Sequence, residues 1–231
     1  IAVEKDRQLV PLLRSELLLN GLEHVTICEQ DILSLDLNRL AADAGRPLTV
    51  IGNLPYNISS QVVIKLIRER HALTRAVLMF QKELADRLCS PPGSRVYGRL
   101  SVMLQYCARI KALRDVKADQ FFPRPKVDSA VLRIDFKSEI APAARSEAML
   151  ERVVQAAFGQ RRKTLRNAMA SGFASLDTQA VVQLLESAGI DPRRRAETLS
   201  VQEFVALANV SAAAFQITDS PPPTPSGHPT Y

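Results

Sequence analysis

The stretch "VIGNLPYNIS", residues 50–59, contains an apolar run that ends abruptly in Gly-Asn-Leu-Pro-Tyr. A short apolar run of this kind is typical of a buried strand. Pro55 makes the following turn rigid because its ring fixes the backbone φ angle. In open α/β sheets, ligands bind at the carboxyl ends of the strands. The stretch therefore places an amide, Asn53, and an aromatic ring, Tyr56, where such a fold binds its ligand.

Composition and length indicate a globular protein. The chain has 231 residues, of which 46% are hydrophobic and 23% are charged, and this is neither disordered nor membrane composition. No apolar run approaches the roughly 18 residues needed to span a bilayer, and no signal peptide is visible. Three cysteines without a CxxC or Cys/His cluster argue against disulfides and zinc and suit a reducing cytoplasm. A net charge of +6 is compatible with a nucleic-acid partner.

Strands and helices alternate along the first part of the chain, which predicts an α/β fold. We expect a doubly wound, Rossmann-like and mostly parallel sheet with helices on both faces. Strands are expected at "IAVEKD", "HVTICEQD", "LTVIGN" and "RAVLMFQK", and an antiparallel edge hairpin at "ARIKALRDV" and "SAVLRIDFK". Helices are expected at residues 7–20, at "SSQVVIKLIRER" with Ser59 or Ser60 as its cap, at "KELADRL" and at "RLSVMLQYCA".

The pattern changes after Lys137, where a linker is followed by helical segments. Helices are expected at residues 148–171, 178–188 and 201–209. The end of the chain is rich in proline. We therefore predict an α/β domain at residues 1–137, a small all-helical domain at residues 138–210 and a disordered tail at residues 211–231.

Two carboxylates follow the first two expected strands. Glu4 ends the first strand and Asp31 ends the second. In a doubly wound fold, such residues accept hydrogen bonds from the ribose hydroxyls and the adenine amine of a cofactor. The alternative is that both carboxylates cap the helices that follow them. No GxGxxG motif is present in the sequence.

The residues after the third strand suit methylation of an exocyclic adenine amine. The N6 lone pair is delocalised into the ring and is a poor nucleophile. The side-chain oxygen of Asn53 and the carbonyl of Leu54 can both accept from N6–H, which frees the lone pair to attack a sulfonium methyl. Pro55 holds the turn and Tyr56 offers a stacking face. Catalysis would then be mainly positioning and electrostatics. The alternative is an ordinary strand followed by a turn.

Several motifs together resemble one enzyme family. "GNLPYNIS" resembles motif IV of the adenine-N6 dimethyltransferases that act on ribosomal RNA. "QFFPRPKVDSAVLRI" resembles a later motif of that family, and "AFGQRRKTLRNAM" resembles the start of its helical C-terminal domain. The resemblance covers residues 1–209, and the bacterial small-subunit (16S) rRNA type fits best. It implies S-adenosylmethionine as methyl donor and two adjacent adenosines near the 3′ end of small-subunit rRNA as target. It also implies an immature small subunit as partner, a cytoplasmic monomer, and neither a membrane nor a metal.

The resemblance assigns roles to individual residues. It makes Glu4 the ligand of the cofactor ribose, Asp31 the ligand of its adenine and Ile32 an apolar cover, with Asn53 touching both cofactor and target. It makes Phe121 the aromatic residue that covers the target base opposite Tyr56. The catalytic set is Asn53, Leu54, Pro55, Tyr56 and Phe121.

Basic residues are expected to contact RNA phosphates. Arg124 and Lys126 flank the expected base pocket. A dense cluster in one expected helix comprises Arg161, Arg162, Lys163 and Arg166, and Arg193, Arg194 and Arg195 form a second cluster. The alternative for each cluster is a solvated surface.

The resemblance implies a first strand and a glycine-rich loop upstream of Ile1, so we expect the sequence to be N-terminally truncated. We expect a protein that begins at Ile1 to bind S-adenosylmethionine weakly, to have little activity and to be less stable than a longer form.

Three other functions are compatible with parts of the sequence. One is a large-subunit rRNA dimethyltransferase that confers antibiotic resistance. Another is a non-catalytic RNA-binding factor of the same fold, such as an assembly or transcription factor, against which the intact Asn-Leu-Pro-Tyr motif argues. The third is a small-molecule methyltransferase, which would have no basic helical domain.

Overall fold

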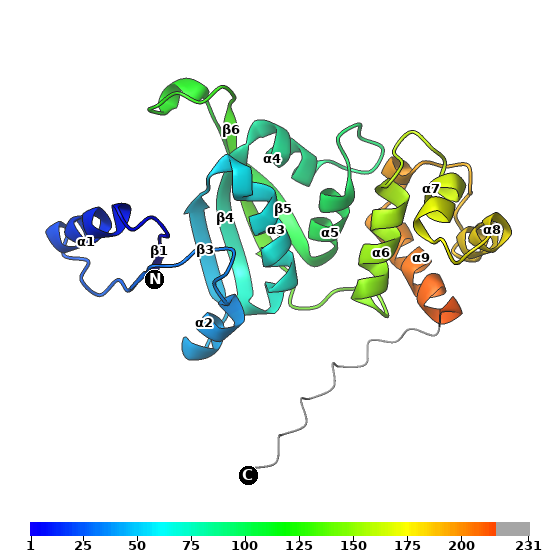
Figure 1. Cartoon of the computed structure of the whole chain (residues 1–231), viewed down its shortest axis with the longest axis horizontal. Helices are drawn as coiled ribbons and strands as arrows, with labels where there is room; N and C mark the ends of the chain where they lie inside the picture. Colours follow the sequence, from blue (N-terminus) through cyan, green and yellow to red (C-terminus); the bar gives the residue numbers. More distant parts are fainter. Residues whose placement is uncertain (216–231) are drawn as a thin grey trace, which may run out of the picture. The chain divides into compact units, whose positions relative to one another are not determined.

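The computed structural model describes residues 1–215, which form helices and strands in two compact units (Figure 1). The first unit comprises Ile1–Asp86 and Cys107–Ser138. The second comprises Arg87–Tyr106 and the described part of the chain from Glu139 onward. The second unit thus takes in residues 87–106, a segment that precedes the expected helical domain in the sequence.

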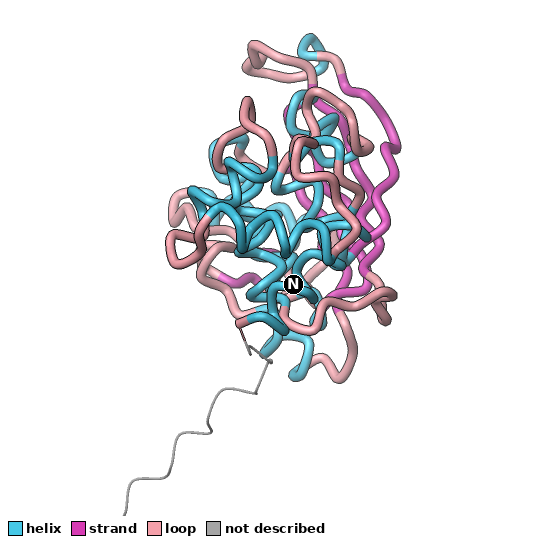
Figure 2. The backbone as a smooth tube through the Cα atoms, turned by 90° about the vertical axis from the view of Figure 1, so that its right-hand side faces the viewer, coloured by secondary structure: helices cyan, strands magenta, loops and turns pink. Residues whose placement is uncertain are grey.

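A four-stranded mixed sheet organises the first unit. The strand order is β3 (Leu48–Asn53), β4 (Leu73–Gln81), β6 (Ser129–Phe136) and β5 (Ala108–Val116). Strand β3 is parallel to β4, whereas β6 is antiparallel to both β4 and β5. Figure 2 shows these strands side by side. The expected antiparallel edge hairpin is confirmed.

Two further strands form a separate parallel pair. They are β1 (Ala2–Val3) and β2 (Ile27–Cys28), and each is only two residues long. Within the described residues no backbone ladder joins this pair to the larger sheet. The expectation of one mostly parallel sheet therefore differs from the observed arrangement, because β6 runs opposite to its neighbours and makes two of the three strand pairings of the larger sheet antiparallel.

The core of the first unit lies on the central strands and on one helix. Ala76, Leu78 and Phe80 alternate along β4 and are fully buried, as the period of two in a strand requires. On β6, Leu132 and Ile134 are equally inaccessible. Helix α3 (Ser59–Arg68) contributes four more buried residues at helical spacing: Val62, Val63, Leu66 and Ile67.

The beginnings of several helices differ from the expectations. Helix α1 (Leu9–Leu19) tolerates Pro11 because its first turn has no intrahelical partners for the N–H groups. Helix α2 (Leu37–Asp43) was not expected, and Asp36 caps it by accepting from the Arg39 N–H at 3.0 Å. Ser59 and Ser60 do not cap α3, because a 3₁₀ turn, η1 (Tyr56–Ile58), runs directly into it. Further short turns are η2 (Arg70–Ala72), η3 (Ala118–Gln120) and η4 (Ala196–Thr198).

The second unit is helical. Helix α4 (Lys82–Cys89) begins in the first unit, and α5 (Arg99–Cys107) lies almost wholly in the second. The remaining helices are α6 (Glu147–Phe158), α7 (Leu165–Gly172), α8 (Thr178–Ser187) and α9 (Val201–Ala214). Helix α9 continues to Ala214, although the tail was expected to begin at residue 211. Residues 216–231 of the expected tail lie outside the described residues.

The expectation of one helix over residues 148–171 is wrong. The segment divides into α6 and α7, which are joined by a turn at residues 159–164. Gly172 explains how closely the two helices pack, because a Cβ atom there would lie 2.8 Å from the Cα of Ala156 and would clash with its Cβ. Helical periodicity continues through the turn in sequence, so only the tertiary contact reveals the break.

The described residues contain neither a helix that could span a membrane nor a cluster of side chains that could bind a metal. Among residues 1–215 no helix is long and apolar enough to cross a membrane. In the same part of the chain, no three His, Cys, Asp or Glu side chains are placed to hold a metal ion.

Replacing Gly172 by alanine should destabilise the protein by about 1–3 kcal/mol, the typical cost of overpacking a close contact. The expected measurement is a lower midpoint of urea unfolding. The matched control exchanges the two residues, in the double variant Gly172→Ala/Ala156→Gly, which removes the clashing methyl group from α6. Recovery of much of the lost stability is expected in the double variant, and equal stability of Gly172→Ala and the parent would contradict the packing.

Candidate active site

The two segments that carry the motif residues lie at the same end of the larger sheet. Asn53, the last residue of β3, is opposite Met79 near the end of β4. Ser129, the first residue of β6, is opposite both Gln81 at the end of β4 and Val116 at the end of β5. The Asn-Leu-Pro-Tyr turn and the loop between β5 and β6 therefore lie at the same end of the sheet, where the parallel strands β3 and β4 have their carboxyl ends.

Asn53 stands on a turn of fixed shape. A Cβ on Gly52 would lie 3.3 Å from the Cδ2 of Leu78, so the residue before Asn53 has little room for a side chain. The Pro55 carbonyl accepts from the Ile58 N–H and from the Ser59 hydroxyl, both at 3.2 Å. Asn53 is exposed, and its side-chain amide makes no hydrogen bond within residues 1–215. The turn thus holds an amide that is free to bind a ligand.

Tyr56 is anchored by a residue that the sequence analysis did not identify. Its hydroxyl lies 2.7 Å from the hydroxyl of Ser129, which is completely buried. The bond joins the turn after β3 to the first residue of β6, two strands away in the sheet. The ring of Tyr56 is thereby fixed at its hydroxyl end and is half-buried. Ser129 lies in the "PKVDSAV" motif, which is the only sequence signal that could have pointed to it.

The loop at residues 117–128 is closed at its base by Asp128. The carboxylate accepts from the Lys117 ammonium at 2.8 Å and from the Ala118 N–H at 3.0 Å. The Asp128 carbonyl accepts from the Lys82 N–H at 2.9 Å. The hydrogen bond from Lys117 is the main reason that the pKa of Asp128 is lowered. Ends held in this way limit the positions that the loop can adopt.

This loop carries the two aromatic residues of the "QFFPRPK" motif. Phe121 is half-buried and follows η3, whereas Phe122 is fully exposed, at 101% of its reference area. Arg124 and Lys126 are both exposed on the same loop. The loop therefore brings together the aromatic and basic residues that were expected around a base.

Glu4 and Asp31 follow the two short parallel strands, as expected. Asp31 accepts from the Leu33 N–H at 2.9 Å and from the Lys5 ammonium at 3.1 Å, and these bonds lower its pKa, the backbone bond most. Glu4 accepts from the Asp6 N–H at 2.8 Å. Ile32 is half-buried beside Asp31.

Neither carboxylate caps the helix that follows it, so the capping alternative is wrong. The residue before α1 is Gln8, and the cap of α2 is Asp36. Glu4 instead shapes the turn directly after β1, and Asp31 shapes a turn that begins three residues after the end of β2. The ladders of the two sheets do not connect these residues with Asn53.

The basic cluster expected in one helix is divided by the structure. Arg161, Arg162 and Lys163 lie in the turn before α7, and only Arg166 is helical. The expectation that all four residues lie in one helix is therefore wrong. Arg161 donates to the carbonyls of Arg95 at 2.8 Å and Tyr97 at 3.0 Å, so its guanidinium holds the segment before α5.

Three exposed cations remain in this region. The side chains of Arg162 and Lys163 make no hydrogen bond or ion pair within residues 1–215. Arg166 makes only a long bond, 3.4 Å, to the Asn167 side chain beside it. These three side chains are available to a partner, whereas one guanidinium nitrogen of Arg161 is committed to the two carbonyls.

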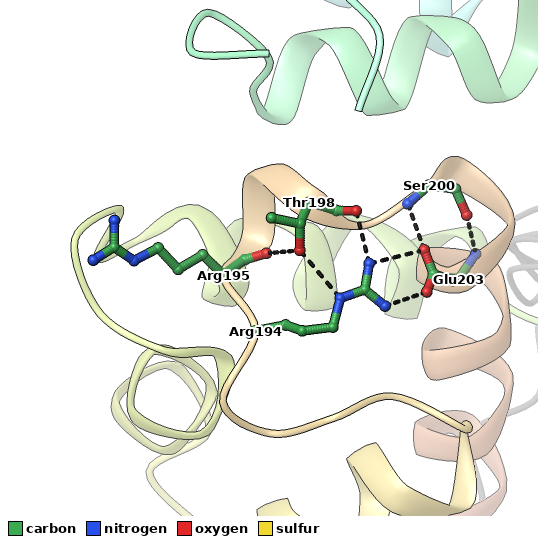
Figure 3. Close-up of polar contacts among 5 residues, drawn as sticks. All are labelled: Arg194, Arg195, Thr198, Ser200 and Glu203. Atoms are coloured by element: carbon green, nitrogen blue, oxygen red, sulfur yellow. Dashed lines mark hydrogen bonds and ion pairs between the residues drawn. The ribbon is translucent and has the colours of Figure 1, made fainter. Parts of the chain in front are cut away.

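The second cluster is also mostly committed to internal contacts. Arg194 donates to both oxygens of Glu203, to the Thr198 carbonyl at 2.7 Å and to the Thr198 hydroxyl at 3.2 Å (Figure 3). Glu203 and Ser200 form a capping box at the start of α9. The bond from Arg194 is the main cause of the lowered pKa of Glu203. Figure 3 shows the side chain of Arg195 pointing away from this network.

Arg193 is paired locally, with both oxygens of Asp191 at 3.3 Å. Of the second cluster, only Arg195 has a side chain without a hydrogen bond or ion pair in the described part of the chain. The expectation of a three-arginine phosphate site is therefore wrong for Arg194, which stabilises the second unit.

The bond between Tyr56 and Ser129 should be measurable as a coupling. Ser129→Ala and Tyr56→Phe should each lower the free energy of unfolding by about 1 kcal/mol, because each leaves a buried or half-buried hydroxyl without its partner. In the double variant neither hydroxyl remains, so its loss should be smaller than the sum of the two single losses. Urea unfolding of the four proteins gives the coupling, and strictly additive losses would contradict the hydrogen bond.

Comparison with known proteins places the chain in a family. The family model described as "Ribosomal RNA adenine dimethylase" matches residues 1–213. The ribosomal RNA small subunit methyltransferase A of Desulforapulum autotrophicum is 49% identical over 90% of this chain and 73% of its own length. The protein of the same name from Chromohalobacter salexigens is 44% identical over 90% of this chain and 71% of its own length.

Solved structures show the same fold. The crystal structure of a dimethyladenosine transferase from Plasmodium falciparum has a TM-score of 0.76 at 22% identity and covers 94% of this chain and 82% of its own. The 23S rRNA methyltransferase ErmE has a TM-score of 0.63 at 21% identity and covers 90% and 80%, respectively. The expected Rossmann-like methyltransferase fold is therefore confirmed. From the match across nearly all of the described residues, the chain belongs to the ribosomal RNA adenine dimethylase family.

Proposed function

We propose that the chain transfers methyl groups from S-adenosylmethionine to N6 of two adjacent adenosines near the 3′ end of small-subunit rRNA. The product is N6,N6-dimethyladenosine, made while the small subunit is being assembled. The observation that carries the proposal is the free amide of Asn53 on a fixed turn at the carboxyl edge of the sheet. Membership of the rRNA adenine dimethylase family supports the substrate class, and the names of the relatives support the small subunit over the large one.

For the reaction, the chain must hold and polarise the N6 amine of the target adenosine. In the first transfer the side-chain oxygen of Asn53 and the carbonyl of Leu54 accept from the two N6–H groups. In the second transfer one of them accepts from the single N6–H that remains, and N6 loses one proton in each transfer. The nitrogen then becomes more tetrahedral, and its lone pair is released from the ring. Pro55 and the bonds to its carbonyl keep the two acceptors in place during the reaction. Such preorganised polar groups lower the barrier because they need little rearrangement as charge develops.

The aromatic residues hold the base. Tyr56 supplies one face, and its bond to Ser129 keeps the ring in a single orientation. Phe121, on the loop that Asp128 closes, supplies the opposite face. Stacking on aromatic rings typically contributes about 1–3 kcal/mol per base. The pair therefore supports binding of a base that has left its own stack.

The residues after β1 and β2 fit the cofactor's adenosine. The carboxylates of Glu4 and Asp31 are at the carboxyl ends of neighbouring parallel strands, and the ribose hydroxyls and adenine amine are donors. Each carboxylate retains acceptor capacity beyond the bonds that it already makes. Ile32 would cover the adenine. When bound, S-adenosylmethionine supplies the electrophilic methyl group.

The second unit supplies the electrostatic part of RNA binding. We assign phosphate contacts to Arg162, Lys163 and Arg166, and on the first unit to Arg124 and Lys126. Such contacts give affinity and orientation but little sequence discrimination. The protein would act as a monomer in the cytoplasm, where the small subunit is assembled.

Asn53→Ala should lower methyl transfer by about a hundredfold or more, because one preorganised acceptor at the reacting amine is lost. Affinity for immature small subunits should change less than about twofold, since phosphate contacts supply most of it. Transfer of a labelled methyl group to immature small subunits, by a form of the protein extended upstream of Ile1, measures the first, and co-sedimentation measures the second. Asn57→Ala is the matched control, because Asn57 is exposed in the same motif and should be neutral. Near-parental transfer by Asn53→Ala would exclude the proposed role.

Replacing Arg162, Lys163 and Arg166 by glutamine should weaken RNA binding and flatten its dependence on salt. Three lost phosphate contacts should reduce the slope of log affinity against log salt by about two to three units. Arg161→Gln and Arg194→Gln should instead lower the midpoint of unfolding, because both guanidinium groups hold the second unit together. An unchanged salt slope in the triple variant would show that these cations are only solvated.

A further inference from the structure

Phe122 is the most exposed large apolar side chain in the described part of the protein. Its accessible area is 101% of the reference value, whereas the adjacent Phe121 is half-buried. Single exposed apolar residues are common and need no explanation by themselves. Phe122 differs because of the loop that carries it and the charges beside it.

The loop at residues 117–128 presents Phe122 on a restrained backbone. Asp128 joins the two ends of the loop through its bonds to Lys117 and Ala118. Pro123 and Pro125 fix two φ angles between Phe122 and the base of the loop. Figure 1 shows this loop projecting beyond the sheet between β5 and β6. A side chain on such a loop loses less conformational entropy when it binds than one on a flexible segment.

The neighbouring charges indicate the chemistry of the partner. Arg124 and Lys126 are exposed and form no hydrogen bond or ion pair within residues 1–215. An aromatic ring next to unpaired cations is the pattern that binds single-stranded nucleic acid, in which the rings stack on bases and the cations contact phosphates. A purely apolar partner would use the ring but would leave Lys126 without a counter-charge and Arg124 with only the charge of Asp128, which already accepts a hydrogen bond from Lys117.

We infer that Phe122 stacks on a second, unpaired RNA base that neighbours the target adenosine, while Arg124 and Lys126 contact the phosphates on either side. The site differs from the target pocket, whose faces are Tyr56 and Phe121. This inference rests on the proposed function, because it takes the substrate to be rRNA. It adds that the loop holds the strand at a base other than the one that is methylated.

The test measures binding of a single-stranded RNA that contains the two adjacent adenosines, by fluorescence anisotropy. A parallel series carries 2-aminopurine at each position around the target, because its emission is quenched by stacking. Phe122→Ala should weaken binding roughly 5- to 100-fold, as expected for one lost stack. It should also restore 2-aminopurine emission at one position next to the target.

Two further variants separate stacking from simple apolar contact. Phe122→Tyr keeps the aromatic face and should bind like the parent, whereas Phe122→Leu keeps apolar bulk and should bind like Phe122→Ala. Val127→Ala is the matched control, because Val127 is 44% exposed on the same loop and should be neutral. Thermal unfolding of each variant should match the parent, since Phe122 is fully exposed.

Each outcome has a definite meaning. Parental affinity of Phe122→Ala or Phe122→Leu overturns the stacking site and leaves the proposed function intact if the parent methylates rRNA. If Phe122→Ala binds immature subunits more weakly but binds the RNA like the parent, Phe122 contacts a ribosomal protein. This result also overturns the inference. A parent that neither binds the RNA nor methylates rRNA removes the proposed function together with the inference.

Discussion

The register between β4 and β6 determines where the candidate active site lies. Gln81, the last residue of β4, is opposite Ser129, the first residue of β6. Because β3 runs parallel to β4, this register brings the turn after β3 and the start of β6 to one edge. The hydrogen bond between Tyr56 and Ser129 depends on it. A slip of one residue would turn Ser129 to the other face of the sheet and would remove the anchor of Tyr56.

The local sequence was sufficient to predict the position and bounds of strands such as β3. "LTVIGN" forms β3 with the expected bounds, and Asn53 lies at the end of the strand with a free amide. The antiparallel pair at the edge was also predictable, because two strand-like segments follow each other in sequence with no helix expected between them. Helix boundaries were less predictable. The periodicity of residues 148–171 continues through the turn at residues 159–164, and the close contact of Gly172 with Ala156 appears only in the folded chain.

Residue type alone could not distinguish structural cations from available ones. Arg161 and Arg162 are adjacent in sequence, yet Arg161 donates to two carbonyls and Arg162 makes no bond within residues 1–215. Arg194 is similarly committed to Glu203, while Arg195 points away from that network. Whether each arginine is bonded within the protein depends on a partner that lies nine or more residues away in sequence. The same reason hid Ser129, whose role depends on a tyrosine 73 positions earlier.

The central claim is that the turn after β3 holds the amine that is methylated. The most direct measurement is a structure of the protein bound to an immature small subunit, in which the distance from the Asn53 side-chain oxygen to the nearest adenosine N6 is determined. The account predicts a hydrogen-bond distance of about 2.6–3.2 Å, with the base between Tyr56 and Phe121. An rRNA adenosine bound away from this turn, with Asn53 facing solvent, would contradict it.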